Sequence, residues 1–165
     1  MKYSITKIEK NHVNRHFGES QSAGSRFRCD LFPTVESVFD LLLHRQPINI
    51  ILQNNNTEAH EFLIEDNSYI GWLGLGLLSE FESALIQKEM RNGYETKFIE
   101  VDSLPTTNFI TVISSPIENT YFQIITLFPG QYAPAFPNDR MSIDDFRNAS
   151  EFWDTHILLK CTKPA

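Results

Sequence analysis

The chain has 165 residues, which is the usual length of one domain, and we expect a single domain over residues 1–165. Hydrophobic residues make up 41% and charged residues 21%, which is close to globular averages and excludes a disordered, collagen-like or coiled-coil protein. The formal net charge of -7 argues against a protein that coats nucleic acid, because phosphate binding relies on basic surface.

The cysteines and the hydropathy of the chain indicate its compartment. Cys29 and Cys161 are too few for a disulfide framework and lack the close spacing of a metal site, so we interpret them as reduced thiols. The sequence has no apolar run of about eighteen residues, and polar residues follow the first methionine. We therefore expect a cytoplasmic protein with no export signal and no contact with membranes.

The N-terminal half predicts a strand, two helices and two strands. In chain order these are residues 3–8, 11–17, 35–43, 48–52 and 60–65. Asn11 caps the first helix, and Thr34 caps the second, whose apolar residues recur at helical spacing.

The C-terminal half is richer in strand signals. It predicts a glycine-rich buried turn or tight strand, a helix opened by a capping box, three strands and a last helix. These are residues 70–78, 79–91, 96–101, 108–114, 121–128 and 142–153. Two of the three strands predict an antiparallel hairpin. We therefore expect an α+β fold in which N-terminal helices pack on a C-terminal antiparallel sheet.

Basic residues are concentrated at the start of the chain. Residues 1–28 carry six basic and two acidic side chains, a balance of +4, which leaves 8 basic and 19 acidic side chains in residues 29–165, a balance of -11. A positive segment on an acidic body can hold a particular anion while disfavouring indiscriminate binding to polyanions. Alternatively, the basic and acidic segments neutralise one another across the surface.

The positive segment contains a histidine pair. His12 and His16 are four residues apart, so a helix places both imidazoles on one face, beside Arg15. Histidine titrates near neutral pH, so such a pair can supply one base and one acid for cleaving RNA through its 2'-hydroxyl group. A guanidinium from Arg15, Arg26 or Arg28 can stabilise the charge that builds on the phosphate.

The same pair has two other interpretations. An H-x-x-x-H spacing also suits a zinc pair, although the zincin pattern needs Glu after the first His and here Val13 stands there. A structural role, with His12 packed and His16 solvated, also fits. We expect no metal and no cofactor.

Separated segments of the chain resemble a known group of toxins. They are N-H-V-N-R-H-F at residues 11–17, S-A-G-S-R-F at 22–27, F-I-T-V-I at 109–113 and Y-F-Q-I-I-T-L-F-P-G at 121–130. Together they resemble the small ribonuclease toxin domains of the barnase/EndoU/colicin/RelE type in bacterial polymorphic toxin systems.

The resemblance implies roles for particular residues. It puts His12 and His16 at acid/base positions, with Arg15 near the phosphate. It also implies that Ser25 and Thr126 donate hydroxyl hydrogen bonds to the phosphate, and that Phe128 offers a stacking surface for a base.

Two functions follow from the sequence. The first is a metal-independent endoribonuclease that acts on RNA, with tRNA as one candidate substrate, leaves a cyclic phosphate and has a cognate immunity or antitoxin protein as partner. The second is a non-catalytic immunity or adaptor domain whose acidic body binds a basic protein. Convergence of His12, His16, Ser25 and Thr126 in one cleft would favour the enzyme, and separation would favour the interaction protein.

Overall fold

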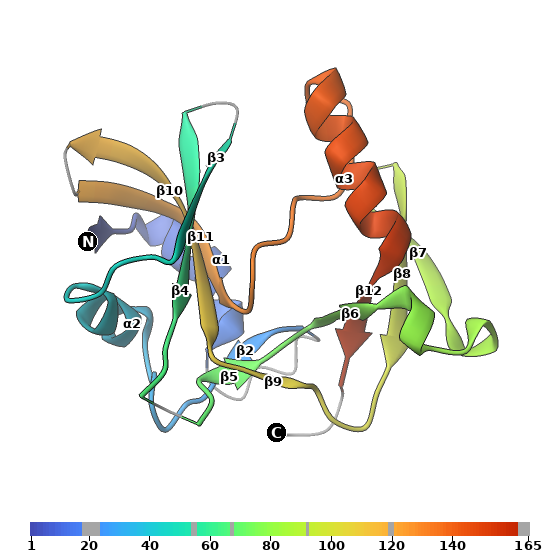
Figure 1. Cartoon of the computed structure of the whole chain (residues 1–165), viewed down its shortest axis with the longest axis horizontal. Helices are drawn as coiled ribbons and strands as arrows, with labels where there is room; N and C mark the ends of the chain where they lie inside the picture. The colour runs from blue at the N-terminus through green and yellow to red at the C-terminus, as the bar shows by residue number, and fades with distance from the viewer. Residues whose placement is uncertain (18–23, 54–55, 67, 92, 119–120, 162–165) are drawn as a thin grey trace.

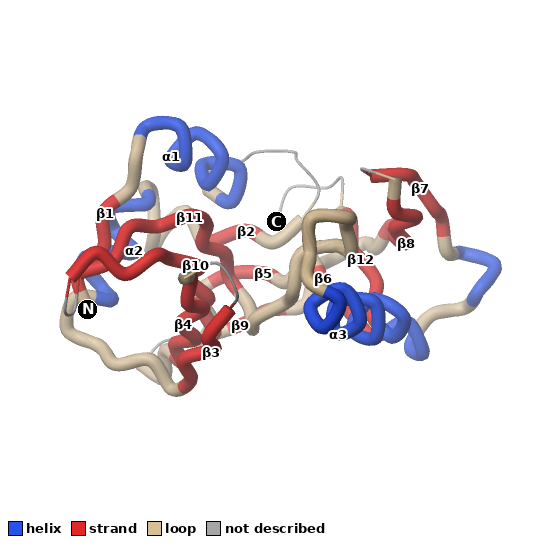
Figure 2. The backbone as a smooth tube through the Cα atoms, turned by 90° about the horizontal axis from the view of Figure 1, so that it is seen from above, coloured by secondary structure: helices blue, strands red, loops and turns tan. Residues whose placement is uncertain are grey.

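The structure is a computed structural model that describes residues 1–17, 24–53, 56–66, 68–91, 93–118 and 121–161. It has two regions, each built on its own sheet (Figure 1). The five-stranded region contains the first two helices, and the four-stranded region contains the last helix. A small third sheet lies between them (Figures 1 and 2).

The five-stranded sheet combines strands from both halves of the sequence. Its spatial order is β1 (Lys2–Ser4), β11 (Tyr121–Pro129), β10 (Phe109–Glu118), β4 (Thr57–Leu63) and β3 (Asn49–Gln53). β1 runs parallel to β11, and the other neighbours are antiparallel. The β10–β11 pair is the expected hairpin.

Two helices pack on this sheet: α1 (Lys7–Val13), continued by the 3-10 turn η1 (Asn14–His16), and α2 (Val35–Leu42). Thr34 caps α2 through a capping box, as expected. The helices bury Val13, Val35, Val38 and Leu42 in one cluster with apolar residues of β4, β10 and β11. Burial of this apolar surface is the main stabilising contribution in the region.

The four-stranded sheet has the order β6 (Leu75–Leu77), β12 (His156–Lys160), β8 (Tyr94–Glu100) and β7 (Gln87–Arg91). β12 is antiparallel to β6 and parallel to β8. The helix α3 (Ile143–Thr155) precedes β12 and begins at the cap Ser142, as expected. Two 3-10 turns, η2 (Leu78–Glu80) and η3 (Ser83–Leu85), connect β6 to β7.

The third sheet joins the two regions and has the order β2 (Arg26–Phe27), β5 (Gly71–Trp72) and β9 (Thr106–Thr107). A side chain at Gly71 would collide with the backbone carbonyl oxygen of Arg26, so only glycine allows β5 to approach β2 this closely. The glycine-rich segment is therefore strand, as one of the two interpretations predicted.

The predicted architecture is wrong. The molecule is mostly β, with three sheets, and its longest helix lies near the C-terminal end of the chain. A sheet built from C-terminal strands alone would leave out the N-terminal strands that pair with the outer edges of β10 and β11 in this structure. β1 and β4, both from the N-terminal half, cover those edges.

The helix predicted over residues 79–91 is also wrong. Ser79 and Glu82 have the spacing of a capping box, but the chain forms two short 3-10 turns and then β7. Pairing of β7 with β8 overrides the local signal, as tertiary context often does. No described helix has the length and hydropathy needed to cross a membrane.

Candidate active site between the two regions

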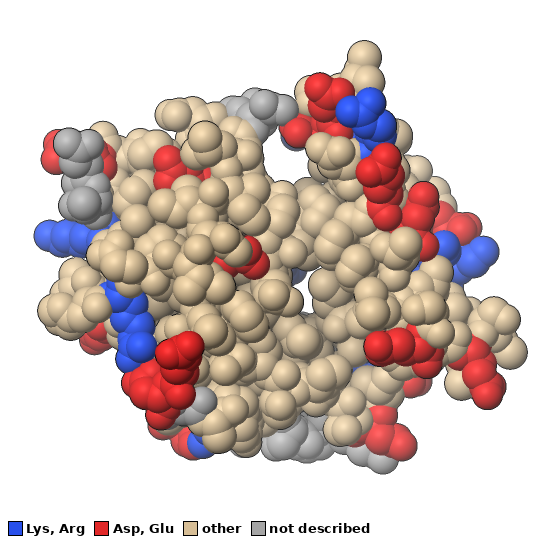
Figure 3. Space-filling view, in the orientation of Figure 1, with Lys and Arg blue, Asp and Glu red and all other residues tan. Residues whose placement is uncertain are grey.

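A cavity of about 440 Å³ lies between the five-stranded and four-stranded regions. Its polar lining comes from distant parts of the sequence: Arg15 and His16 from η1, Ser25 before β2, Arg91 from β7 and Lys160 from β12. The space-filling view shows that the surface is hollowed between the two regions (Figure 3). Both regions are therefore needed to form this cavity.

His16 is the buried acid/base group of the cavity, with 7% of its surface exposed. Its Nδ1 atom lies 2.7 Å from the carbonyl oxygen of Ser25, and its Nε2 atom lies 3.3 Å from Nε of Arg15. A carbonyl oxygen only accepts and a guanidinium only donates, so neutral His16 donates from Nδ1 and accepts at Nε2. This places the lone pair of the imidazole on the Arg15 side.

Burial keeps the His16 imidazole neutral. Burial is the largest cause that lowers the pKa of His16 to about 4; the hydrogen bond to the Ser25 carbonyl opposes this shift, and nearby Arg15 and His12 contribute to it. At neutral pH the side chain therefore has no positive charge and can accept a proton. A neutral imidazole of this kind can act as a general base.

Three cations face the cavity: Arg15, Arg91 and Lys160. Arg15 and Arg91 line the same cavity, and burial, together with the charge of Arg91, lowers the pKa of Arg15. Glu89 pairs with Arg91 at 2.8 Å and with Lys160 at 3.3 Å, so one carboxylate serves two cations. Among the described residues that line the cavity none is acidic, so the site favours an anion.

Aromatic side chains form one wall of the cavity. The rings of Phe136 and Trp153 are 4.3 Å apart between centroids, and Trp153 donates its indole N–H to the carbonyl oxygen of Pro134 at 3.1 Å. This hydrogen bond ties the loop before α3 to the helix. The cavity therefore combines cations with flat apolar surface, as sites for nucleotides do.

Gly74 brings two chain segments together beside the cavity. A Cβ atom at this position would lie 2.6 Å from the backbone nitrogen of Ser25 and 2.8 Å from the Cα atom of Gly24. Only glycine allows this approach without a shift of the backbone. The segment that presents its carbonyl oxygen to His16 is thus positioned against Gly74.

The structure brings together three of the residues that the sequence singled out, namely Arg15, His16 and Ser25. The Ser25 hydroxyl lies 3.5 Å from Nδ1 of His16. Phe128 on β11 is close to the site, because its ring centroid is 6.4 Å from that of His16. These four residues form a contiguous group at the edge of the five-stranded region.

His12 does not line the cavity with His16, although the two were expected on one helical face. The α-helix ends at Val13 and a 3-10 turn follows. An α-helix turns about 100° per residue and a 3-10 helix about 120°, so the change of helix type rotates His16 away from His12. His12 is exposed and His16 is buried, the reverse of the structural alternative considered above.

Besides Phe128, which lies near the cavity without lining it, three other candidate residues also lie outside the cavity lining. Thr126 is half-buried on β11, opposite Ile113 of β10. Arg26 is buried in β2. Arg28 forms two hydrogen bonds with Asp30, and its guanidinium lies 4.3 Å from the centre of the Tyr69 ring.

Sequence reasoning missed four residues of the site: Arg91, Lys160, Phe136 and Trp153. Arg91 fell in the segment expected to be helical, and Lys160 follows an apolar run that gave only a strand signal. No local motif connects these positions to His16, because the fold alone brings them together. For zinc, the described residues include no group of three or more His, Cys, Asp or Glu placed to hold a metal ion.

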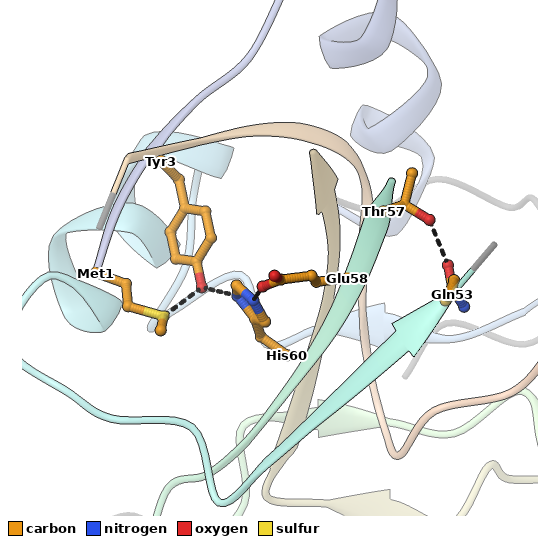
Figure 4. A network of polar contacts seen from close by, with 6 residues as sticks. All are labelled: Met1, Tyr3, Gln53, Thr57, Glu58 and His60. Carbon is orange, nitrogen blue, oxygen red and sulfur yellow. Dashed lines mark hydrogen bonds and ion pairs between the residues drawn. The ribbon is translucent and has the colours of Figure 1, made fainter. Parts of the chain in front are cut away.

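A second histidine, His60, lies in a polar network inside the five-stranded region (Figure 4). The Tyr3 hydroxyl is 2.7 Å from Nδ1 of His60, and Oε2 of Glu58 is 2.7 Å from Nε2. A carboxylate only accepts, so Nε2 of His60 donates to Glu58, while Nδ1 shares a hydrogen bond with the Tyr3 hydroxyl. Burial, with the charge of Glu58, raises the pKa of Tyr3 well above its usual value. The network ties β1 to β4 within the core.

Comparison with known proteins shows that the fold of this chain is similar to that of a solved structure. No family model and no curated protein matches the sequence. Among solved structures, the chain is similar to the crystal structure of a conserved hypothetical protein from Toxoplasma gondii ME49, with a TM-score of 0.61 and 10% sequence identity. The alignment covers 96% of this chain and 94% of that chain. At this identity the likeness extends to the fold and not to a function.

Proposed function

We propose that the protein is a metal-independent endoribonuclease whose active site is the cavity between the two regions. The observation that carries the proposal is the convergence of a neutral, buried His16 with Arg15, Arg91 and Lys160 in a protein whose net charge is -7. Three cations lie together beside an imidazole that can accept a proton, although the protein as a whole is acidic. Such a site can bind a phosphodiester and take a proton from its ribose.

His16 is the proposed base. Its Nδ1–H group is held by the carbonyl oxygen of Ser25, so Nε2 has the lone pair that accepts the proton of the ribose 2'-hydroxyl. Arg15 occupies that lone pair at 3.3 Å without substrate. A phosphate is a stronger partner for a guanidinium than an imidazole is, so substrate binding turns Arg15 to the phosphate and frees Nε2.

The cations complete the proposed reaction. The 2'-oxygen bonds to phosphorus, the bond from phosphorus to the 5'-oxygen breaks, and a cyclic phosphate remains. Arg15 and Arg91 stabilise the charge on the phosphoryl oxygens. His12 is outside the cavity, so we assign protonation of the leaving 5'-oxygen to Nζ of Lys160, which is held by Glu89 at 3.3 Å. His16 then returns its proton to solvent and Lys160 regains one.

The proposed setting is the cytoplasm, where RNA is present and the free cysteines Cys29 and Cys161 stay reduced. A toxin of the small ribonuclease type would require an immunity or antitoxin protein. The exposed side of the cavity, with its cations, suits an acidic inhibitor.

A cleavage assay tests the proposal. The purified protein is incubated with total RNA in EDTA, and products are examined for cyclic phosphate ends. We expect cleavage, and His16→Asn should lower the rate by about 100-fold or more. The matched control is His44→Asn, an exposed histidine outside the cavity lining, which should leave the rate unchanged. Absence of cleavage by folded protein would overturn the proposal that the protein is a ribonuclease.

A second candidate is the non-catalytic interaction protein. It is favoured by the positions of His12 and Thr126, which do not converge with His16 and Ser25. The acidic surface of α3 also suits it, since Asp144, Asp145, Glu151 and Asp154 outnumber Arg147 (Figure 3). Binding of a basic protein that is lost when these acids are neutralised, without any cleavage of RNA, would support this candidate.

A further inference from the structure

A second cavity, of about 790 Å³, lies between β3 and α3. Ile51, Leu52 and Gln53 of β3 form one wall, and residues 132–142 together with α3 form the other. The space-filling view shows an opening in the surface between β3 and α3 (Figures 1 and 3). No described residue lines both this cavity and the one that contains His16, so the inference does not rest on the proposed function.

Apolar side chains line both walls of this second cavity. They include Ile51, Leu52, Pro134, Ala135, Met141 and Phe152. Leu52 is 77% exposed, so a large apolar side chain borders the cavity without being covered by the protein. A ligand that covers it would remove apolar surface from water. The volume is within the range of sites that hold small molecules, and such sites combine apolar walls with a few polar groups.

The charges of the lining balance each other. Among the described residues of this lining, Arg140 is the basic one and Asp145 is the acidic one. The other polar side chains are amides and hydroxyls, which carry no charge. The cavity that contains His16 differs, because three cations and no described acidic residue line it. The second cavity therefore favours an uncharged ligand over a phosphate.

Tyr132 is the polar group that the structure holds in place beside this cavity. Its backbone N–H group donates to Oε2 of Glu61 at 2.8 Å, and its hydroxyl oxygen accepts from Nε2 of Gln53 at 2.8 Å. The Gln53 amide is held in turn, because the Thr57 hydroxyl donates to its Oε1 atom at 3.0 Å. Both ends of Tyr132 are therefore fixed before any ligand binds.

The Tyr132 hydroxyl can donate a hydrogen bond to a ligand. Its oxygen accepts from Gln53, so its proton is available, and no acceptor for this proton is found among the described residues. Burial raises the pKa of Tyr132, and the charge of Asp145 contributes, whereas the hydrogen bond from Gln53 opposes the change. The hydroxyl therefore stays protonated at neutral pH.

We propose that the second cavity binds an uncharged, largely apolar molecule that has a carbonyl group, and that the Tyr132 hydroxyl donates to the carbonyl oxygen. A carbonyl oxygen only accepts, so it matches the one fixed donor of the lining. Ile51, Leu52 and Phe152 pack against the apolar part of the ligand. The balanced charges of Arg140 and Asp145 leave no net attraction for an anion or a cation.

Binding of Nile red, an uncharged apolar dye with a carbonyl group, tests the proposal. Its fluorescence should rise on titration with the protein and saturate at one dye per chain. Fluorenone and fluorene, the same ring system with and without a carbonyl oxygen, should both displace the dye. Tyr132→Phe should weaken fluorenone binding about fivefold, because one hydrogen bond is lost, and should leave fluorene binding unchanged.

Tyr121→Phe on β11, outside the lining of both cavities, is the control and should leave both affinities unchanged. Leu52→Asp places a charge on the exposed wall and should abolish dye binding. Leu85→Asp, at an apolar residue that is 58% exposed outside both linings, should keep it. Melting curves verify that each variant is folded.

Four results would overturn the proposal. The first is wild-type protein that shows no saturable dye binding, and the second is dye binding that persists in Leu52→Asp. The third is equal weakening of fluorene and fluorenone by Tyr132→Phe, which would show that the hydroxyl does not recognise the carbonyl oxygen. The fourth is displacement of the dye by inorganic phosphate, which would show that the cavity takes an anion.

Discussion

The five-stranded and four-stranded regions differ in how much core they bury. Sixteen of the described residues form the cluster centred on the five-stranded sheet, whereas the cluster of the four-stranded region has five. Yet each region supplies cations to the cavity between them. The larger core is the scaffold that holds His16, and the smaller region contributes Arg91 and Lys160 from strands with less support. Stability and charge are thus unequally divided between the regions.

The largest effect should come from truncating the larger core. Phe62 on β4 is 1% exposed, and Phe62→Ala should cost about 3–5 kcal/mol of unfolding free energy. Leu159→Ala in β12 should cost less, within about 2–5 kcal/mol, because it removes a smaller side chain, from the smaller cluster, at a position that borders the cavity. Urea denaturation measures both. An equal or larger loss in Leu159→Ala would contradict the comparison.

The next effect concerns pH, at the boundary between the regions. The pKa of His16 is about 4 in the folded protein and near 6.5 when unfolded, so the unfolded chain binds more protons between these values. Stability should therefore fall as pH drops from about 6.5 toward 4, by up to about 3 kcal/mol.

His16→Asn should remove this part of the pH dependence, and His44→Asn, at an exposed position, should keep it. The melting temperature measured at intervals from neutral to acidic pH gives the slope. The same slope in wild type and His16→Asn would show that His16 is not held neutral by burial.

A smaller effect is expected from the network that ties β1 into the larger core. Tyr3→Phe removes the hydroxyl that lies 2.7 Å from Nδ1 of buried His60, and it should cost about 1–3 kcal/mol. Tyr121→Phe on the adjoining strand β11 is the control, with an expected change within about 0.5 kcal/mol. Urea denaturation measures the unfolding free energy of both variants. Equal losses of unfolding free energy would show that the Tyr3–His60 hydrogen bond does not stabilise the core.

The smallest effect should come from an exposed ion pair on α3. Arg147 lies 3.0 Å from Asp144, and the side chains are 64% and 77% exposed. Arg147→Ala should change stability by no more than about 0.5 kcal/mol, and by less at high salt. A loss above about 1 kcal/mol would show that α3 depends on its surface charges.

The sequence predicted elements with strong local signals. Thr34 and Ser142 begin helices where their caps indicated, and the β10–β11 hairpin follows from two β-rich runs. The sequence did not predict elements whose structure depends on pairing with a distant strand. Residues 87–91 have a helical start signal nearby but form β7, because β8 offers a partner strand.

The site was predicted only where its residues are close in sequence. Arg15 and His16 lie in one turn, and the histidine spacing in the positive N-terminal segment pointed to them, whereas Ser25 was implied only by the resemblance to ribonuclease toxins. The positive charge of residues 1–28 accounts for only one cation of the cavity, Arg15. Arg28 bonds Asp30, and the other two cations of the cavity, Arg91 and Lys160, come from β7 and β12. A 3-10 turn replaced the end of the first helix and separated the histidine pair, which no spacing rule anticipates.

The position of β12 affects how the molecule folds. β12 lies between β6 and β8, with Ile157 opposite Gly76 and Leu158 opposite Phe98. During synthesis β6 and β8 emerge long before the strand that both of them pair with. Contacts between residues so far apart in sequence slow folding and leave strand edges exposed in the meantime. The four-stranded sheet therefore cannot be completed before β12 is synthesised, and the cavity receives Lys160 only with that strand.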